Sequence, residues 1–101
     1  MIIYNVTINV EDDIHNDWVV WMKDVHIPEV MSTKMFADYS FSKLLTRQDD
    51  ETGTTYVIQY LAPTMEHYEK YIDEFASELR DKTVAKFGSR FIAFRTLMER
   101  V

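Results

Sequence analysis

The sequence predicts a single α+β domain over residues 1–101, in which a four-stranded antiparallel sheet carries two helices on one face. Two observations lead to this prediction. Four segments alternate between apolar and polar residues with a period of two, and two others carry apolar residues at helical spacing. They follow one another in the order strand, helix, strand, strand, helix, strand (βαββαβ). A chain of this length has room for one hydrophobic core and not for two.

The first strand is predicted over residues 2–10, and the first helix follows it directly. Residues 2–10 alternate as a strand does when one of its faces lies on a core. The acidic run at 11–13 suits the N-terminus of a helix, where negative charge is stabilised. The helix itself is indicated by an apolar stripe of Ile14, Trp18, Trp21, Met22 and Val25. Because Pro28 disfavours helical geometry in the residue before it, we expect the regular helix to end near His26, or one loose turn later.

A hairpin and a second helix are predicted next. Residues 35–47 return to period two, the polar run at 48–53 suits a turn, and residues 54–62 form the next strand. Thr64 suits the N-cap of a second helix, and Gly88 suits its left-handed end. The apolar stripe of this helix consists of Tyr68, Tyr71, Ile72, Phe75 and Leu79. Residues 90–99 alternate again and form the last strand.

Two right-handed crossovers around a central hairpin give a ferredoxin-like sandwich, which leaves one face of the sheet uncovered. The residues expected on this open face are Ile3, Asn5, Thr7, Phe36, Asp38, Ser40, Leu44, Val57, Gln59, Leu61, Ala93, Arg95 and Leu97. Such a mixed apolar and polar patch usually marks an interface, and a second copy could cover it across a two-fold axis. We therefore expect a homodimer, with Asn5, Asp38, Gln59 and Arg95 at the interface. Asp38 of one copy would pair with Arg95 of the other, directly or through Gln59.

The composition argues against several classes of partner. Eleven basic and seventeen acidic residues give a net charge of -6, so neither nucleic acid nor an anionic membrane is an expected partner. The lack of cysteine excludes disulfides and thiolate zinc sites. No apolar run approaches the roughly 20 residues of a membrane helix. The N-terminus also lacks the features of a signal peptide, and we expect a cytoplasmic protein.

Short groups of residues along nearly the whole chain resemble one protein family. They are Tyr4-Asn5-Val6-Thr7, Trp18, Trp21-Met22, His26-Ile27-Pro28, Tyr56, Gln59-Tyr60, Phe87-Gly88 and Phe91-Ile92-Ala93-Phe94-Arg95-Thr96. On these residues the chain resembles the small bacterial domain-of-unknown-function family 4286, within the dimeric α+β barrel superfamily. The resemblance implies a dimeric α+β barrel with a small-molecule cleft between the helices and the sheet of each subunit. It implies no reaction, although the superfamily includes quinone-forming monooxygenases, haem-degrading enzymes, lactone isomerases and ligand-sensing regulators.

His26 is the candidate catalytic residue. The pKa of histidine lies near working pH, and a helix C-terminus stabilises its cation, so His26 could act as an acid or a base on a ligand. The alternative is a structural histidine that caps helix carbonyls before Pro28. The candidate ligand-binding residues are Trp18, Trp21, Tyr39, Tyr60, Tyr68 and Tyr71. Aromatic walls with a few polar tips suit a flat organic ligand, but ordinary core packing accounts for the same residues.

The sequence predicts no metal site and no cofactor. His15, His26 and His67 fall on separate segments without the spacing of a zinc motif. No dinucleotide-binding, P-loop or nucleophile-elbow motif is present. Two functions remain open. One is a cofactor-independent enzyme, monooxygenase-like or isomerase-like, acting on a small aromatic or cyclic metabolite. The other is a non-catalytic module that binds a small molecule or a protein.

Overall fold

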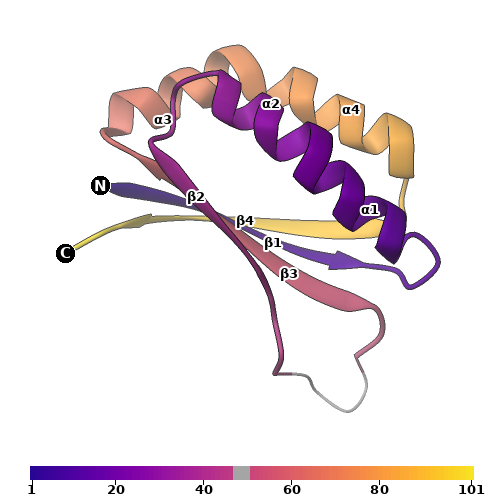
Figure 1. The fold of residues 1–101 in the computed structure, drawn as a ribbon. Helices are drawn as coiled ribbons and strands as arrows, with labels where there is room; N and C mark the ends of the chain where they lie inside the picture. Colours follow the sequence, from indigo (N-terminus) through magenta and orange to yellow (C-terminus); the bar gives the residue numbers. More distant parts are fainter. Residues whose placement is uncertain (47–50) are drawn as a thin grey trace.

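The computed structural model describes residues 1–46 and 51–101, and its elements follow the predicted order (Figure 1). The described strands form one antiparallel sheet in the order β2-β3-β1-β4. Their bounds are β1 (Ile2–Val10), β2 (Asp38–Lys43), β3 (Thr54–Ala62) and β4 (Phe91–Glu99). The helices lie together on one face of this sheet (Figure 1). The predicted ferredoxin-like α+β fold is therefore confirmed.

Two long helical stretches cover the sheet, and each contains a π-helical segment. The first consists of α1 (His15–Trp21), η1 (Met22–His26) and α2 (Ile27–Ser32). The second consists of α3 (Met65–Tyr71), η2 (Ile72–Ala76) and α4 (Ser77–Phe87). The predicted N-cap of the second stretch is confirmed, because the Thr64 side chain accepts a hydrogen bond from the His67 N–H. The helix ends at Gly88 with the predicted positive φ, 62°, but its ψ of −130° differs from that of a left-handed helical cap.

The first helical stretch continues to Ser32, so the predicted end near His26 is wrong. Ile27 keeps helical angles, with φ −61° and ψ −45°, and its N–H donates to the carbonyl of Met22, five residues earlier. This wider π turn comes immediately before Pro28. Proline then stands in the first turn of α2, where its missing N–H is tolerated. The preference against helical geometry before proline is overridden by the π turn.

The π segments keep the apolar side chains of both stretches over the sheet. The buried residues of the first stretch are Trp18, Met22, Ile27 and Val30, and those of the second are Tyr71, Ala76, Leu79, Thr83 and Phe87. Within each stretch, consecutive buried residues are three or four positions apart, except for one pair. That pair lies across the π segment and is five positions apart. The predicted burial of Trp18 and Met22 is confirmed, whereas Trp21 is half-buried.

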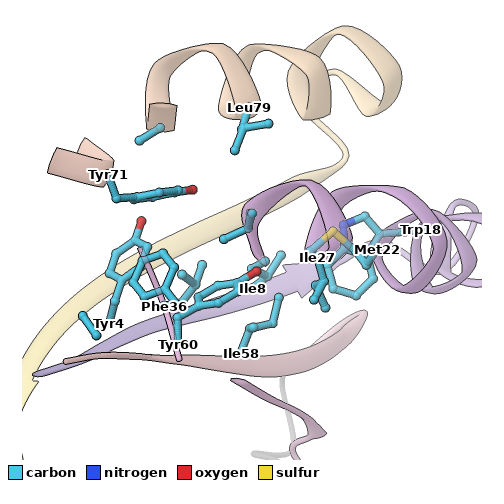
Figure 2. Packing of buried hydrophobic residues seen from close by; sticks show 14 of the residues in the cluster. Tyr4, Ile8, Trp18, Met22, Ile27, Phe36, Ile58, Tyr60, Tyr71 and Leu79 are labelled. Carbon is cyan, nitrogen blue, oxygen red and sulfur yellow. The ribbon is translucent and has the colours of Figure 1, made fainter. Parts of the chain in front are cut away.

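Strand β1 lies at the centre of the core. Its inner residues Ile2, Tyr4, Val6, Ile8 and Val10 are all buried, as the alternation predicts. Figure 2 shows the rings of Tyr4, Tyr60 and Tyr71 at one end of the core and Trp18 at the other. Phe36 packs with the same three tyrosine rings, so its predicted position on the open face is wrong. It precedes β2, which begins at Asp38 and not at residue 35, and strand alternation therefore does not set its direction.

Strand β4 presents the opposite face from the one predicted. Arg95 pairs directly with Val6, which faces the helices, and residues paired in this way share a face of the sheet. The helix-facing residues of β4 are therefore Phe91, Ala93, Arg95 and Leu97, and its open-face residues are Ile92, Phe94, Thr96 and Met98. Asp38 lies on the open face. The predicted interface position of Arg95, and its predicted pairing with Asp38, are consequently wrong.

The other predicted interface residues do lie on the open face. Asn5 and Gln59 pair in the register, and Gln59 Nε2 donates a hydrogen bond to Asn5 Oδ1 at 3.2 Å. The role of these residues and of Asp38 in an interface stays a prediction. Residues 48–50 of the predicted turn lie outside the described residues. No helix in the described part of the chain is long and apolar enough to cross a membrane.

Candidate functional site

A cavity of about 290 Å³ lies between the helices and the sheet. Its apolar lining residues are Val6, Ile8, Met22, Ile58, Val84, Phe91 and Ala93. Its polar lining residues are Tyr4, His26, Tyr60, Tyr71, Arg80, Thr83 and Arg95. None of the described lining residues is acidic. A mainly apolar space with a few convergent polar groups is typical of a small-molecule site, and this volume is at the lower end of the range of such sites, about 300–1,000 Å³.

Two inward-facing positions with small side chains leave room for this cavity. Ala93 on β4 stands opposite Ile8, and Thr83 belongs to the buried side of α4. Both residues line the cavity. A larger side chain at either position would occupy part of its volume. The cavity therefore follows from residue size at two positions on otherwise regular elements.

His26 lies in η1, within the helical stretch and not at its end. Its ring stacks on that of Trp21, with centroids 5.4 Å apart, and its Nδ1 lies 3.4 Å from Thr83 Oγ1. Burial lowers the pKa of His26 to about 4; the nearby Glu29 carboxylate opposes this shift and the Arg95 guanidinium adds to it. The predicted stabilisation of the cation by a helix C-terminus is therefore wrong. His26 is neutral at pH 7, so it can accept a hydrogen bond or a proton.

Three tyrosine side chains bring hydroxyl groups to the cavity. The Tyr60 hydroxyl is buried, on a residue that is 2% exposed, and has no hydrogen-bond partner in the described part of the chain. Burial raises the pKa values of Tyr60 and Tyr71 well above the usual range of tyrosine, so both hydroxyls stay protonated. The Tyr4 hydroxyl accepts a hydrogen bond from Arg80 Nη2 at 2.9 Å. Figure 2 shows the hydroxyl ends of Tyr60 and Tyr71 within the space between the sheet and the helices.

Among the described lining residues, Arg80 and Arg95 carry the positive charge. Arg80 comes from α4 and is half-buried, and Arg95 comes from the edge strand β4 and is exposed. Both guanidinium groups lower the pKa of Tyr71, against the stronger opposite effect of burial and of Tyr4. Both charges therefore act on the Tyr71 hydroxyl. The site can donate several hydrogen bonds to an anion near this hydroxyl.

The structure brings together three of the residues that the sequence singled out, namely His26, Tyr60 and Tyr71. The remaining candidates, Trp18, Trp21, Tyr39 and Tyr68, do not line this cavity. Trp18 is fully buried in the core, and its indole N–H has no partner in the described residues. Tyr39 is exposed near the start of β2. The roles of all these residues in binding or catalysis stay predictions.

Arg80, Thr83 and Arg95 were missed as site residues. Thr83 lies four residues after Leu79 and four before Phe87, so it falls on the same helical stripe as these apolar residues. A polar residue on such a stripe could have identified Thr83 as a candidate. Arg80 gives no comparable signal, because a charged residue between Leu79 and Asp81 is also what the edge of an amphipathic helix shows. Arg95 was placed on the wrong face, since the two alternating sets of residues in β4 are similarly apolar.

The fold is similar to those of several solved structures at low sequence identity. An ethyl tert-butyl ether d (EthD) family protein from Bacillus halodurans has a TM-score of 0.73 and 10% identity, with 100% of both chains covered. A dimeric ferredoxin-like protein from an uncultured marine organism has a TM-score of 0.69 and 13% identity, covering 99% of this chain and 94% of the other. SnoaB, a cofactor-independent oxygenase from Streptomyces nogalater, has a TM-score of 0.65 and 10% identity, covering 98% and 91%.

These similarities support the fold and leave the reaction open. No curated protein matches the sequence. The family model described as Domain of unknown function (DUF4286) matches residues 1–101, from end to end of the sequence. The chain therefore belongs to the DUF4286 family, with a ferredoxin-like fold.

Proposed function

We propose that the protein is a cofactor-independent enzyme that binds a small aromatic or cyclic metabolite in the inner cavity and moves a proton on it. His26 is the base in this proposal. The observation that carries it is the Tyr60 hydroxyl, which is buried at the cavity and has no partner within the described residues. A buried hydroxyl without a partner is destabilising, and a bound ligand would supply the missing acceptor.

The contacts of Thr83 support a role for His26 as the base. The Thr83 hydroxyl has one proton, and it donates to the carbonyl of Leu79 at 3.4 Å. Its oxygen then accepts from His26 Nδ1, also at 3.4 Å. In this arrangement Nδ1 carries the proton of the neutral ring, and Nε2 keeps a free lone pair. That lone pair is the group that takes a proton from the ligand.

The proposed step is a proton transfer that needs no oxidant. His26 Nε2 removes a proton from a carbon next to a carbonyl group. The electron pair of the C–H bond forms a new C=C bond, and the π pair of the C=O bond moves onto the carbonyl oxygen. The hydroxyls of Tyr60 and Tyr71 stay protonated and donate to this oxygen as its charge develops. The proton then returns from His26 to another atom of the same molecule. The net result is an isomerisation. The description of SnoaB as a cofactor-independent oxygenase is compatible with such a site.

Deuterium exchange tests this proposal without knowledge of the natural substrate. 2-Tetralone, a fused aromatic ketone with acidic C–H bonds, would be incubated with the protein in D2O, and loss of its proton signal followed by NMR. We expect faster exchange than in buffer alone, and a return to the buffer rate in His26→Gln. His67→Gln is the matched control, because His67 lies at the start of α3 and outside the cavity. Equal exchange rates in the parent protein and His26→Gln would contradict the proposal.

One observation favours the alternative of a non-catalytic binding module. A histidine with a pKa of about 4 is a weak base at neutral pH, because ideal bases have pKa values near the working pH. In this alternative His26 accepts a hydrogen bond from the ligand and removes no proton. Binding of 2-tetralone without any exchange above the buffer rate would support this function and contradict the enzyme.

We also propose that the protein is a homodimer through the open face of the sheet. Ile92 and Phe94 on this face are 59% and 66% exposed, which is unfavourable in a monomer. One structural neighbour is described as dimeric and ferredoxin-like. Light scattering should give twice the 12.0 kDa mass of the chain. Phe94→Glu should give the monomer mass, and a parent protein that is monomeric at micromolar concentration would contradict the homodimer.

A further inference from the structure

We infer that the ligand of the inner cavity carries a carboxylate, which the guanidinium groups of Arg80 and Arg95 bind. This inference rests on the ring binding proposed above and specifies the class of ligand. Two arginines and no acidic residue among the described lining residues make the cavity electropositive. The protein as a whole has the opposite charge, with a net charge of -6.

The two arginines of the cavity form no ion pair with a described carboxylate, in contrast to other cationic side chains on the molecule. Arg90 forms ion pairs with Glu11 and Asp13, and Lys82 forms one with Glu29. Within the described residues, Arg80 instead donates to a neutral hydroxyl, that of Tyr4, and Arg95 forms no ion pair. A half-buried guanidinium group without an anionic partner in the protein can bind the anionic group of a ligand.

The two arginines approach from different layers of the fold. Arg80 is on α4 above the sheet, and Arg95 is on the edge strand β4 of the sheet itself. Arg80 donates a hydrogen bond to the Tyr4 hydroxyl, and the centroid of the Tyr4 ring lies 5.9 Å from that of the Tyr71 ring. The charges of Arg80 and Arg95 both act on the Tyr71 hydroxyl. A carboxylate near Tyr71 would therefore meet donors from both layers. Planar guanidinium groups match the two oxygens of a carboxylate.

The rest of the cavity suits the ring of such a ligand. Val6, Ile8, Ile58 and Phe91 supply apolar walls. The volume of about 290 Å³ limits the ligand to roughly one or two fused rings, because it is at the small end of ligand sites. The Tyr60 hydroxyl, which is almost fully buried and has no described partner, remains free to donate to a second polar atom on the ring.

A bound carboxylate would also act on His26. Burial is the main cause of the low pKa of His26, and the positive charge of Arg95 lowers this pKa further. A carboxylate on Arg95 offsets this charge and favours protonation. The ligand would thus remove the part of the pKa depression that Arg95 causes. Binding and proton transfer would be coupled through one guanidinium group.

The test compares two probes of equal shape and different charge, 2-naphthoate and 2-naphthamide, by isothermal titration calorimetry. We expect the carboxylate to bind at least roughly tenfold more tightly than the amide, as charge-assisted hydrogen bonds imply. Arg95→Gln should abolish most of this preference. Arg95 is exposed on an edge strand, so the variant should fold, which a thermal melt would verify. Arg100→Gln removes the same charge outside the cavity and should keep the preference.

The outcomes separate this inference from the proposed function. Equal binding of the two probes would overturn the carboxylate inference and leave ring binding intact. A preference that survives in both Arg95→Gln and Arg80→Gln would also overturn it. Failure of both probes to bind would contradict ring binding itself, and the inference with it. Tighter binding of 2-naphthoate that depends on Arg95, and is unaffected by Arg100→Gln, would support both.

Discussion

The space between helices and sheet has two halves that are filled in different ways. Beside β2 and β3, the ring of Trp18 packs against those of Phe41 and Tyr56, at centroid distances of 5.9 Å and 5.2 Å. Between α4 and β4, the inward-facing residues Thr83 and Ala93 have small side chains, and the cavity lies beside them. The same scaffold is therefore packed in one half and hollow in the other. We expect substitutions in the packed half to change stability, and substitutions around the cavity to change binding.

The largest effect is expected in the packed half. Trp18→Ala removes a fully buried ring and should lower the free energy of unfolding by about 3–5 kcal/mol. Trp21→Ala is the matched variant, since Trp21 is half-buried and contacts His26 and Phe87 at the edge of the core. It should cost clearly less. Urea denaturation of both variants measures the difference, and equal losses would contradict the distinction between these two positions.

A smaller effect is expected from the titration of His26. The pKa of its side chain is about 4 in the folded protein and 6.5 in an unfolded chain. As the pH falls between these values, the unfolded state takes up the proton first, so the free energy of unfolding decreases. The stabilisation is complete above about pH 6.5 and is lost towards pH 4, by roughly 2–3 kcal/mol. His26→Gln should flatten the profile between these limits; parallel profiles in urea denaturation would show that His26 does not titrate in this way.

A pair of tyrosine variants should differ by about 1 kcal/mol. Tyr4→Phe loses the hydrogen bond from Arg80 and should lower the free energy of unfolding by about 0.5–1.5 kcal/mol. Tyr60→Phe removes a buried hydroxyl without a described partner and should leave stability unchanged or raised. It should leave the binding of 2-naphthoate nearly unchanged, because this probe carries no second polar atom to accept from the Tyr60 hydroxyl. Thermal melts and calorimetry test both statements, and a larger loss of stability in Tyr60→Phe than in Tyr4→Phe would contradict them.

The smallest change in stability is expected from filling the cavity. Ala93→Ile places a β-branched side chain on β4 opposite Ile8 and into the cavity. We expect an effect of at most about 1 kcal/mol, because the gain from filling offsets some strain. Binding of 2-naphthoate should be lost. Retained binding would mean that the probe occupies another part of the molecule.

The two sheet strands β1 and β4 explain how far the sequence predicts the fold. In β1, apolar residues alternate with Asn5, Thr7 and Asn9, so the face toward the core is evident from the pattern. In β4, Phe91, Ala93 and Leu97 alternate with Ile92, Phe94 and Met98, and both sets are apolar. The periodicity therefore predicts that β4 is a strand, but it does not indicate which of the two sets of residues faces the helices. The register with β1, which depends on the whole sheet, makes that choice.

The site was predictable to a similar extent. Aromatic residues at helical and strand spacing indicated that Tyr60 and Tyr71 face the interior, and the structure places both at the cavity. The error over the face of β4 moved Arg95 to the dimer interface and removed it from the site. The environment of His26 was also mispredicted, because Pro28 indicated a helix end where a π turn continues the helix. Each error concerns tertiary context that a local pattern does not contain.

The π segments have a consequence for insertions and deletions in this chain. A π turn accommodates one residue more than an α-helical turn does. Deletion of one residue within η1 would leave Trp18, Met22, Ile27 and Val30 separated by four, four and three positions, which is ordinary helical spacing. The packing of the helix on the sheet thus does not require the additional residue. His26 lies in this segment, where its ring stacks on Trp21 and its Nδ1 faces Thr83, so such a deletion would change these contacts while it preserves the spacing of the buried residues.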